Sequence, residues 1–135
     1  MRRISFLFSI IAILLLFTNC TNNQTSNSDY IISLEEAEQI LLTEVFQDSI
    51  PFDKEIFKLT EPLERFAKIK SALNQYTINN KSWFFFIDDC PMANWSHPCR
   101  YVLISYYHVW ETNYCIIDED WPPSCFEDMV EVEFK

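Results

Sequence analysis

The chain has 135 residues, of which 49% are hydrophobic and 16% aromatic, and a formal net charge of −10. That length suits one compact domain and is too short for two. Because phosphate groups are bound by clustered lysine and arginine, the acidic charge argues against nucleic-acid binding and against adhesion to an anionic membrane surface.

Residues 1–19 predict a secretory signal peptide. Two arginines open the chain, and 4–17 is apolar apart from two serines. A helix of about 14 residues spans roughly 21 Å, which is short of the roughly 30 Å hydrocarbon core of a bilayer. The segment 16–20 (LFTNC) resembles a bacterial lipobox, although Asn19 departs from the usual small residue. We therefore expect Cys20 to carry lipid; an uncleaved anchor helix is the alternative.

Residues 20–29 are expected to form a polar tether after the lipidated cysteine, and 30–135 a single domain. Cleavage before Cys20 would leave 20 acidic and eight basic side chains, a net charge of −12. The lipid would attach the protein to a membrane without any basic patch. The expected location is the cell envelope, at the outer membrane, facing either the periplasm or the cell surface.

The clearest helix signal covers residues 34–47. Ser33 is a natural N-cap, and Glu36 stands three residues later, as in a capping box. Pro51 sets a limit on the C-terminal side. Helical spacing places one apolar face along this segment, made of Leu34, Ala37, Ile40, Leu41 and Val45.

The next stretch is predicted to be an edge strand followed by a second helix. Residues 55–59 (EIFKL) alternate in polarity. A helix start is indicated at Thr60, where acidic residues and a proline follow. The buried side of this second helix would consist of Leu63, Phe66, Ile69 and Leu73.

From residue 75 onward the pattern predicts strands. Residues 76–78 and 83–87 (WFFFI) suggest a hairpin that turns at Asn79 and Asn80, because asparagine tolerates positive φ in a chain without glycine. Further strands are expected at 101–110, at 114–117 after a turn at Asn113, and at 129–134. Together these elements predict an α+β fold with one or two N-terminal helices packed on an antiparallel sheet of four to five strands.

Four cysteines follow the tether: Cys90, Cys99, Cys115 and Cys125. An even number in an exported small domain predicts a disulfide framework that braces the fold. Short loops favour the pairs Cys90–Cys99 and Cys115–Cys125, although the other two connectivities stay open. The spacings lack the close cysteine pair of a compact zinc site, so we expect no metal.

The segment 32–40 (ISLEEAEQI) resembles the opening helix of PepSY-type domains, which are small α+β modules of protease propeptides and envelope proteins. In those domains a β-hairpin follows the helix, and 83–88 with 100–109 could form it. The resemblance implies a binding or inhibitory module rather than an enzyme. It covers about a third of the mature chain, and the cysteines and the missing hairpin glycine depart from the family pattern.

The densest polar cluster is 88–100 (DDCPMANWSHPCR). One interpretation is a thiol enzyme in which His97 activates Cys99. Another is a cation site at Asp88 and Asp89, which together supply too few oxygen ligands for a full shell. The third is a disulfide-closed loop, with an aspartate capping the turn, Trp95 packed on the sheet and His97 bonded locally. A loop on a rigid scaffold is also a natural contact surface.

A second acidic cluster, 118–125 (DEDWPPSC), has a similar composition. It could bind calcium or a basic partner, with Trp121 as an anchor, but the favoured interpretation is a solvated acidic loop with an end stiffened by proline.

The function expected from these patterns is that of a non-catalytic envelope lipoprotein without a cofactor. It would act through an unknown envelope protein as a propeptide-like inhibitor or accessory module. The candidate partner-binding residues are Asp88, Asp89, Trp95, His97 and Trp121. The alternative is a small thiol- or metal-dependent enzyme that uses the 88–100 loop.

Overall fold

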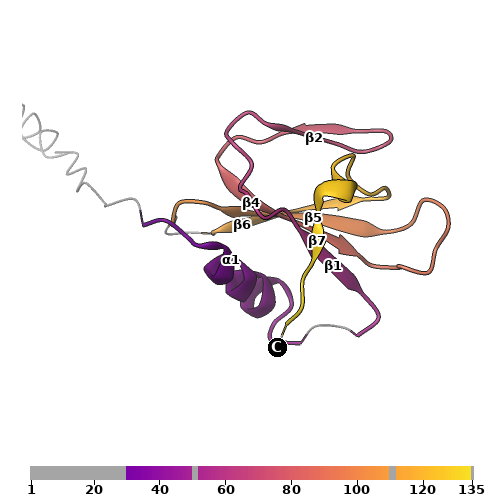
Figure 1. The fold of residues 1–135 in the computed structure, drawn as a ribbon, viewed down its shortest axis with the longest axis horizontal. Coiled ribbons are helices and arrows are strands. Elements are labelled where there is room, and N and C mark those ends of the chain that lie inside the picture. The colour runs from indigo at the N-terminus through magenta and orange to yellow at the C-terminus, as the bar shows by residue number, and fades with distance from the viewer. Residues whose placement is uncertain (1–29, 50–51, 110–111, 135) are drawn as a thin grey trace, which may run out of the picture.

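The computed structural model describes residues 30–49, 52–109 and 112–134, so the predicted signal peptide, Cys20 and the tether lie outside it. A five-stranded antiparallel sheet has the order β6-β5-β4-β1-β7, and a separate two-stranded hairpin joins β2 to β3. Figure 1 shows α1 on one side of the large sheet and β2 on the other. The strands are β1 (Glu55–Lys58), β2 (Lys68–Lys70), β3 (Gln75–Thr77), β4 (Ser82–Asp88), β5 (Cys99–Ser105), β6 (Tyr114–Glu119) and β7 (Val130–Glu131).

The predicted helix and its capping box are confirmed. The helix α1 (Leu34–Ile40) continues as a π-helical segment, η1 (Leu41–Val45). The Ser33 hydroxyl accepts the Glu36 backbone N–H at 3.2 Å, and the Glu36 carboxylate accepts the Ser33 N–H at 2.8 Å. These bonds satisfy backbone donors that a helix start otherwise leaves unpaired.

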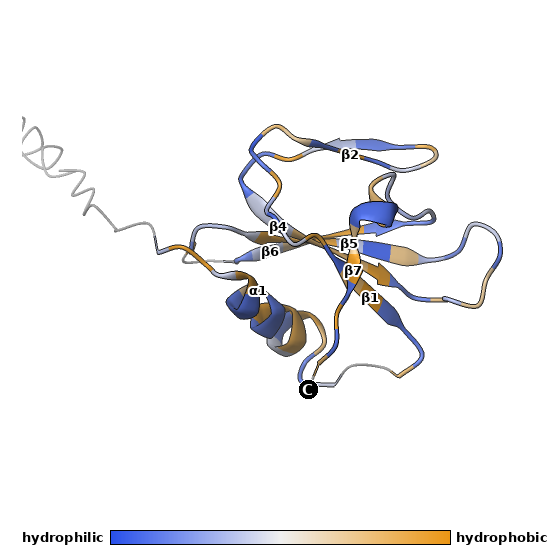
Figure 2. Ribbon diagram, viewed as in Figure 1, coloured by the Kyte–Doolittle hydropathy of each residue, from blue (hydrophilic) through white to orange (hydrophobic). Residues whose placement is uncertain are grey.

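The large sheet is covered on both faces, and its central strand β4 is buried along nearly its whole length. Trp83, Phe85 and Ile87 face a core shared with α1, whereas Phe84 and Phe86 face a core shared with the hairpin. A strand buried on both faces reads as a continuous apolar run rather than an alternating one. Figure 2 accordingly shows hydrophobic residues where the strands cross the middle of the molecule.

The segment before α1 crosses the end of β5. Ile31 forms a β-bridge with Tyr107, and the Ile32 N–H donates to the Tyr106 carbonyl at 2.9 Å. The indole N–H of Trp83 donates to the Ile32 carbonyl at 2.8 Å. The described chain therefore begins beside the C-terminal end of β5. No helix among residues 30–49, 52–109 and 112–134 is long and apolar enough to cross a membrane.

The predicted second helix at 60–73 is wrong, because this segment contains β2 and an isolated bridge from Leu63 to Ser82. Ile69 is buried between two exposed lysines, which is the alternation of a strand. Phe66, expected on the buried face, has a positive φ of 69° and is largely exposed. Apolar spacing compatible with a helix was overridden by pairing with β3.

The predicted hairpin between 76–78 and 83–87 is also wrong. β3 pairs with β2, whereas β4 pairs with β1 and β5. The positive φ angles of the described chain fall at Gln47, Asp48 and Phe66 rather than at the three predicted asparagines. β1, expected at an edge, lies between β4 and β7.

The last three strands of the large sheet lie where strands were predicted, but their lengths differ from the prediction. β5 ends at Ser105 rather than running to Trp110, which lies outside the described residues. β6 confirms the strand expected at 114–117 and continues to Glu119. The last strand keeps two of its expected residues, as β7.

The predicted disulfide framework is not formed, since all four cysteines are free thiols. Cys90 is exposed in a loop, whereas Cys99 is 2% exposed within the core on the hairpin side of the sheet. Cys115 is exposed on β6, whereas Cys125 packs against the same core as Cys99. Each expected pair thus joins one solvent-facing and one inward-facing side chain.

Candidate functional site

The two polar clusters of the sequence meet at one end of the large sheet. Asp88 ends β4 and is opposite Cys99 at the start of β5, which is opposite Glu119 at the end of β6. The loop from Asp89 to Pro98 and the loop after Glu119 therefore leave the same edge. A backbone bond joins them, from His97 N–H to the Asp120 carbonyl at 3.0 Å.

His97 holds its own loop together. Its Nε2 lies 2.9 Å from Oδ1 of Asp88, and its Nδ1 lies 2.6 Å from the Trp95 carbonyl. The same Asp88 oxygen accepts the Cys90 N–H at 2.9 Å, which caps the turn. The bond to the Trp95 carbonyl, together with Asp88, raises the pKa of His97 despite its partial burial. Both ring nitrogens are thus engaged within the loop.

Asp89 anchors the loop through two cations. Arg100 donates to it from Nε and Nη2, both at 2.8 Å, and Lys54 Nζ lies 2.8 Å away. Burial alone would raise the pKa of Asp89, but hydrogen bonds and charge from Arg100 and Lys54 lower it overall. A forked guanidinium–carboxylate pair fixes orientation as well as distance. The loop is thereby tied to β5 and to the segment before β1.

The Cys99 thiol is not arranged as a nucleophile. It donates to the carbonyl oxygens of Glu119 at 3.3 Å and Trp121 at 3.4 Å. Burial, followed by the charge of Glu119, raises its pKa to about 12. A reactive cysteine needs a lowered pKa and a base beside it, whereas His97 bonds to Asp88 and Trp95.

The predicted cation site at Asp88 and Asp89 would use the same loops. Within the described ranges, no group of three or more His, Cys, Asp or Glu side chains is placed to hold an ion. The aspartates of the predicted cation site instead bond to His97, Arg100 and Lys54.

Sequence reasoning missed the structural role of Glu119. Its carboxylate is buried and accepts from the Tyr76 hydroxyl at 2.7 Å, the Asn74 amide at 3.1 Å and the Asp120 N–H at 2.9 Å. Burial raises its pKa, but these donors outweigh that effect and lower it. Alternation along β6 places Glu119 on the same face as Ile117, a signal that could have been used.

Three large apolar side chains remain exposed at this end of the molecule. Trp95 is 72% exposed and Met92 is 89% exposed on the Asp89–Pro98 loop, and Phe52 is fully exposed just before β1. We call these three residues the end patch. Phe52 and Met92 both line an open groove of about 400 Å³. The prediction that Trp95 packs on the sheet is therefore wrong.

The other sequence candidates divide into two groups. Asp88, Asp89 and His97 lie together but serve to hold the loop. Trp121 is half-buried, and its carbonyl accepts from the Tyr101 hydroxyl at 2.6 Å. Lys54 and Phe52 had no signal in the sequence, because they reach this site from a distant segment of the chain.

Comparison with known proteins gave no match: no family model, no curated protein and no solved structure is significantly similar to this chain.

Proposed function

We propose that this protein is a non-catalytic lipoprotein of the cell envelope, anchored through lipid on Cys20, whose folded domain binds a partner protein through the end patch. Its role would be that of an accessory or propeptide-like inhibitory module. The observation that carries the proposal is the exposure of Trp95 and Met92 on a loop that ion pairs hold in place.

Such side chains favour protein contact for a physical reason. Aromatic residues and methionine are enriched at the centres of interfaces, where they bury a large area. Ordering a mobile loop on binding would cost free energy. Here the bonds of Asp88 to His97 and of Asp89 to Arg100 fix the loop beforehand, so less of the contact energy is lost.

The charges indicate the chemistry of the partner. Asp89 is neutralised by Lys54 and Arg100. Asp53 and Glu55 also line the groove, are exposed, and form no ion pair within the described part of the chain. A partner surface that fits would combine an apolar pocket for Trp95 with basic residues around it. The net charge of −12 that cleavage before Cys20 would leave would speed the encounter with such a surface.

Site-specific photocrosslinking in the native envelope tests this proposal. A photoreactive residue at Trp95 or Met92 should give one discrete adduct, and the same residue at Leu73, which is equally exposed on the β2–β3 turn, should give none. Trp95→Ala should abolish the adduct formed from position 92. Equal labelling from position 73, or no adduct from position 95, would contradict the proposal.

The membrane anchor needs a separate test. Metabolic labelling with a radioactive fatty acid should mark the wild-type chain, and Cys20→Ser should remove the label. Cys90→Ser, at an exposed thiol of the domain, serves as the control and should keep it. A label that persists in Cys20→Ser would refute lipidation at this position.

A further inference from the structure

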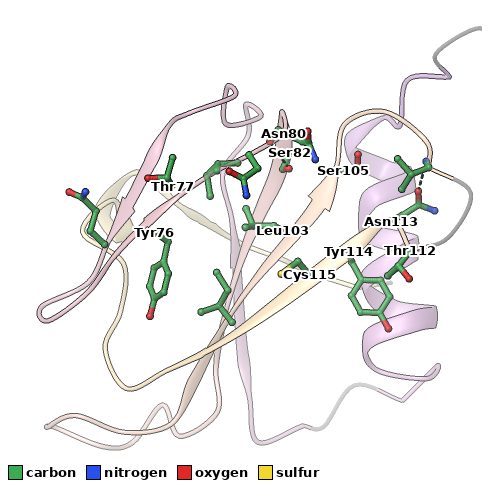
Figure 3. A pocket seen from close by; sticks show the side chains of 15 residues that line it. Tyr76, Thr77, Asn80, Ser82, Leu103, Ser105, Thr112, Asn113, Tyr114 and Cys115 are labelled. Atoms are coloured by element: carbon green, nitrogen blue, oxygen red, sulfur yellow. Dashed lines mark hydrogen bonds between the residues drawn. The ribbon is translucent and has the colours of Figure 1, made fainter.

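A second concave surface lies away from the end patch, between the hairpin strand β3 and the β5–β6 part of the large sheet. It is a cleft of about 540 Å³, within the ~300–1,000 Å³ typical of small-molecule sites. Figure 3 shows Thr77 on one wall, Leu103 and Cys115 across the floor, and Asn80 and Asn113 towards the other end.

None of the residues that line this cleft is charged. That is unusual for a chain in which 22% of residues are charged and the net charge is −10. More than half of the lining residues carry a side-chain amide or hydroxyl. An anion would be bound by lysine or arginine and a cation by carboxylates, so the lining selects a neutral polar ligand.

Hydrogen bonds within the protein leave both kinds of polar group available. The Ser82 hydroxyl donates to the Asn80 carbonyl at 2.9 Å, and the Ser105 hydroxyl donates to the Tyr107 carbonyl at 2.6 Å. Both serine oxygens keep lone pairs that can accept, but Ser82 is 6% exposed, so the half-buried Ser105 is the serine acceptor open to a ligand. Asn113 accepts the Val109 N–H through Oδ1 at 2.9 Å, which leaves its amide NH₂ to donate.

We propose that this cleft binds a neutral oligosaccharide. Sugar hydroxyls donate and accept at the same time, so they match the Ser105 acceptor and the Asn113 donor. These two residues lie side by side in the cleft, joined by the bond from the Ser105 N–H to the Asn113 carbonyl at 2.7 Å. The half-buried side chains of Leu103 and Ile117 give an apolar floor against which the C–H face of a sugar ring can pack. A bound peptide strand would instead use the backbone of the edge strand β6 and would need none of these side chains.

Cys115 supplies a direct probe, because this exposed thiol lies in the cleft whereas the exposed thiol of Cys90 lies at the opposite end of the sheet. The reduced full-length chain would be alkylated with iodoacetamide, with each cysteine followed by peptide mass spectrometry. Cellohexaose and N-acetylchitohexaose are the neutral probes. At ten times its dissociation constant, a probe that binds should slow alkylation of Cys115 about tenfold, with Cys90 unchanged.

Asn113→Asp keeps an oxygen for the Val109 N–H but removes the amide donors and adds a negative charge. Protection of Cys115 should then be lost, whereas Asn94→Asp, in the loop at the other end, should retain it. Thr77→Val, which removes a hydroxyl from an exposed strand position, provides a second variant and should reduce protection about threefold, the loss of one weak neutral hydrogen bond.

Three results would overturn the proposal. The first is unchanged Cys115 reactivity with both oligosaccharides. The second is full protection in Asn113→Asp together with Thr77→Val. The third is protection by a neutral β-forming peptide but by neither sugar, which would assign the surface to strand capture along β6.

Discussion

The two faces of the large sheet are covered in different ways. On the helix face, Ala37 and Leu41 lie in one core with Phe85 and Val102. The only polar side-chain group among the described buried residues of that core is the Trp83 indole N–H, which donates to the Ile32 carbonyl. On the hairpin face, the apolar residues surround polar groups, among them the hydroxyl of Tyr101 and the thiol of Cys99, with the Glu119 carboxylate beside them. The helix face is therefore stabilised mainly by apolar burial, whereas the hairpin face also depends on the hydrogen bonds that satisfy its buried polar groups.

The largest expected effect on stability comes from a substitution in β4, the strand that is buried on both faces of the sheet. Phe85→Ala should lower the free energy of unfolding by about 3–5 kcal/mol, because it leaves a cavity in a fully buried site. Phe84→Ala, its neighbour on the hairpin face, is the matched variant. Urea unfolding followed by tryptophan fluorescence measures both. A loss below about 1 kcal/mol at Phe85 would show that the helix is not packed against β4 as described.

Glu119→Ala should cause the next largest loss of stability. It leaves the Tyr76 hydroxyl, the Asn74 amide and the Asp120 N–H without their acceptor, and each stranded group costs about 1–3 kcal/mol unless water reaches it. Hydrogen exchange should accelerate in β2 and β3 while α1 stays protected. The exposed neighbour Asp118→Ala is the control, and uniform acceleration across both faces would contradict a local role.

Glu119 also predicts an acid response of the hairpin face. Its pKa is lowered in the folded state, so its stabilisation is present above the ordinary glutamate pKa of about 4.3 and is lost as pH falls through the lower folded value. Glu119→Gln should flatten the stability profile below about pH 4. If the melting temperature of Glu119→Gln falls below about pH 4 as steeply as that of the wild type, another group would be responsible for the acid sensitivity.

A smaller effect is expected at the loop end. The pKa of His97 is raised in the folded state, so its contribution is complete below the ordinary histidine pKa of about 6.5 and is lost as pH rises through the folded value. The protection of amides in 89–98 against hydrogen exchange, taken relative to an unstructured peptide at the same pH, should therefore fall above about pH 6.5. His97→Asn should remove this dependence and His108→Asn should keep it; a dependence that persists in His97→Asn would contradict the role given to His97.

The smallest effect on stability belongs to the end patch. Trp95→Ala should change the free energy of unfolding by no more than about 0.5 kcal/mol, because the side chain is 72% exposed. Binding to the envelope partner should nevertheless be lost. A thermal melt measures the stability of the variant, and the crosslink from position 92 measures its binding to the partner. Strong destabilisation would mean that Trp95 packs against the domain after all.

The same contrast explains what the sequence could predict. α1 was found because Ser33 and Glu36 lie close together in the chain and because one face repeats at helical spacing. β4, β5 and β6 were found as aromatic and β-branched runs. The pairing of β2 with β3 was missed, although a strand was expected at 76–78. Three-residue strands show little periodic pattern, and their position depends on distant partners such as Glu119.

The candidate site was predicted in part for the same reason. The loop at 88–100 stood out through its composition, and the aspartate cap and local histidine bond were confirmed. Lys54 and Phe52 join the site only through the fold. The disulfide prediction was wrong. An even number of cysteines is typical of proteins in oxidising compartments, but a disulfide forms only where two thiols face each other at the right distance, and here each expected pair has one exposed and one inward-facing thiol.

The β-bridge of Ile31 with Tyr107 fixes the end of the sheet at which the preceding chain joins the domain. The chain enters at the C-terminal end of β5, and the end patch lies at the N-terminal end of that seven-residue strand, about 20 Å away. Under the proposed anchorage at Cys20, a polar tether reaching up to roughly 30 Å leads to the near end. The end patch would then lie at the end of the domain farther from the point of attachment, so a partner could reach it without first displacing the tether.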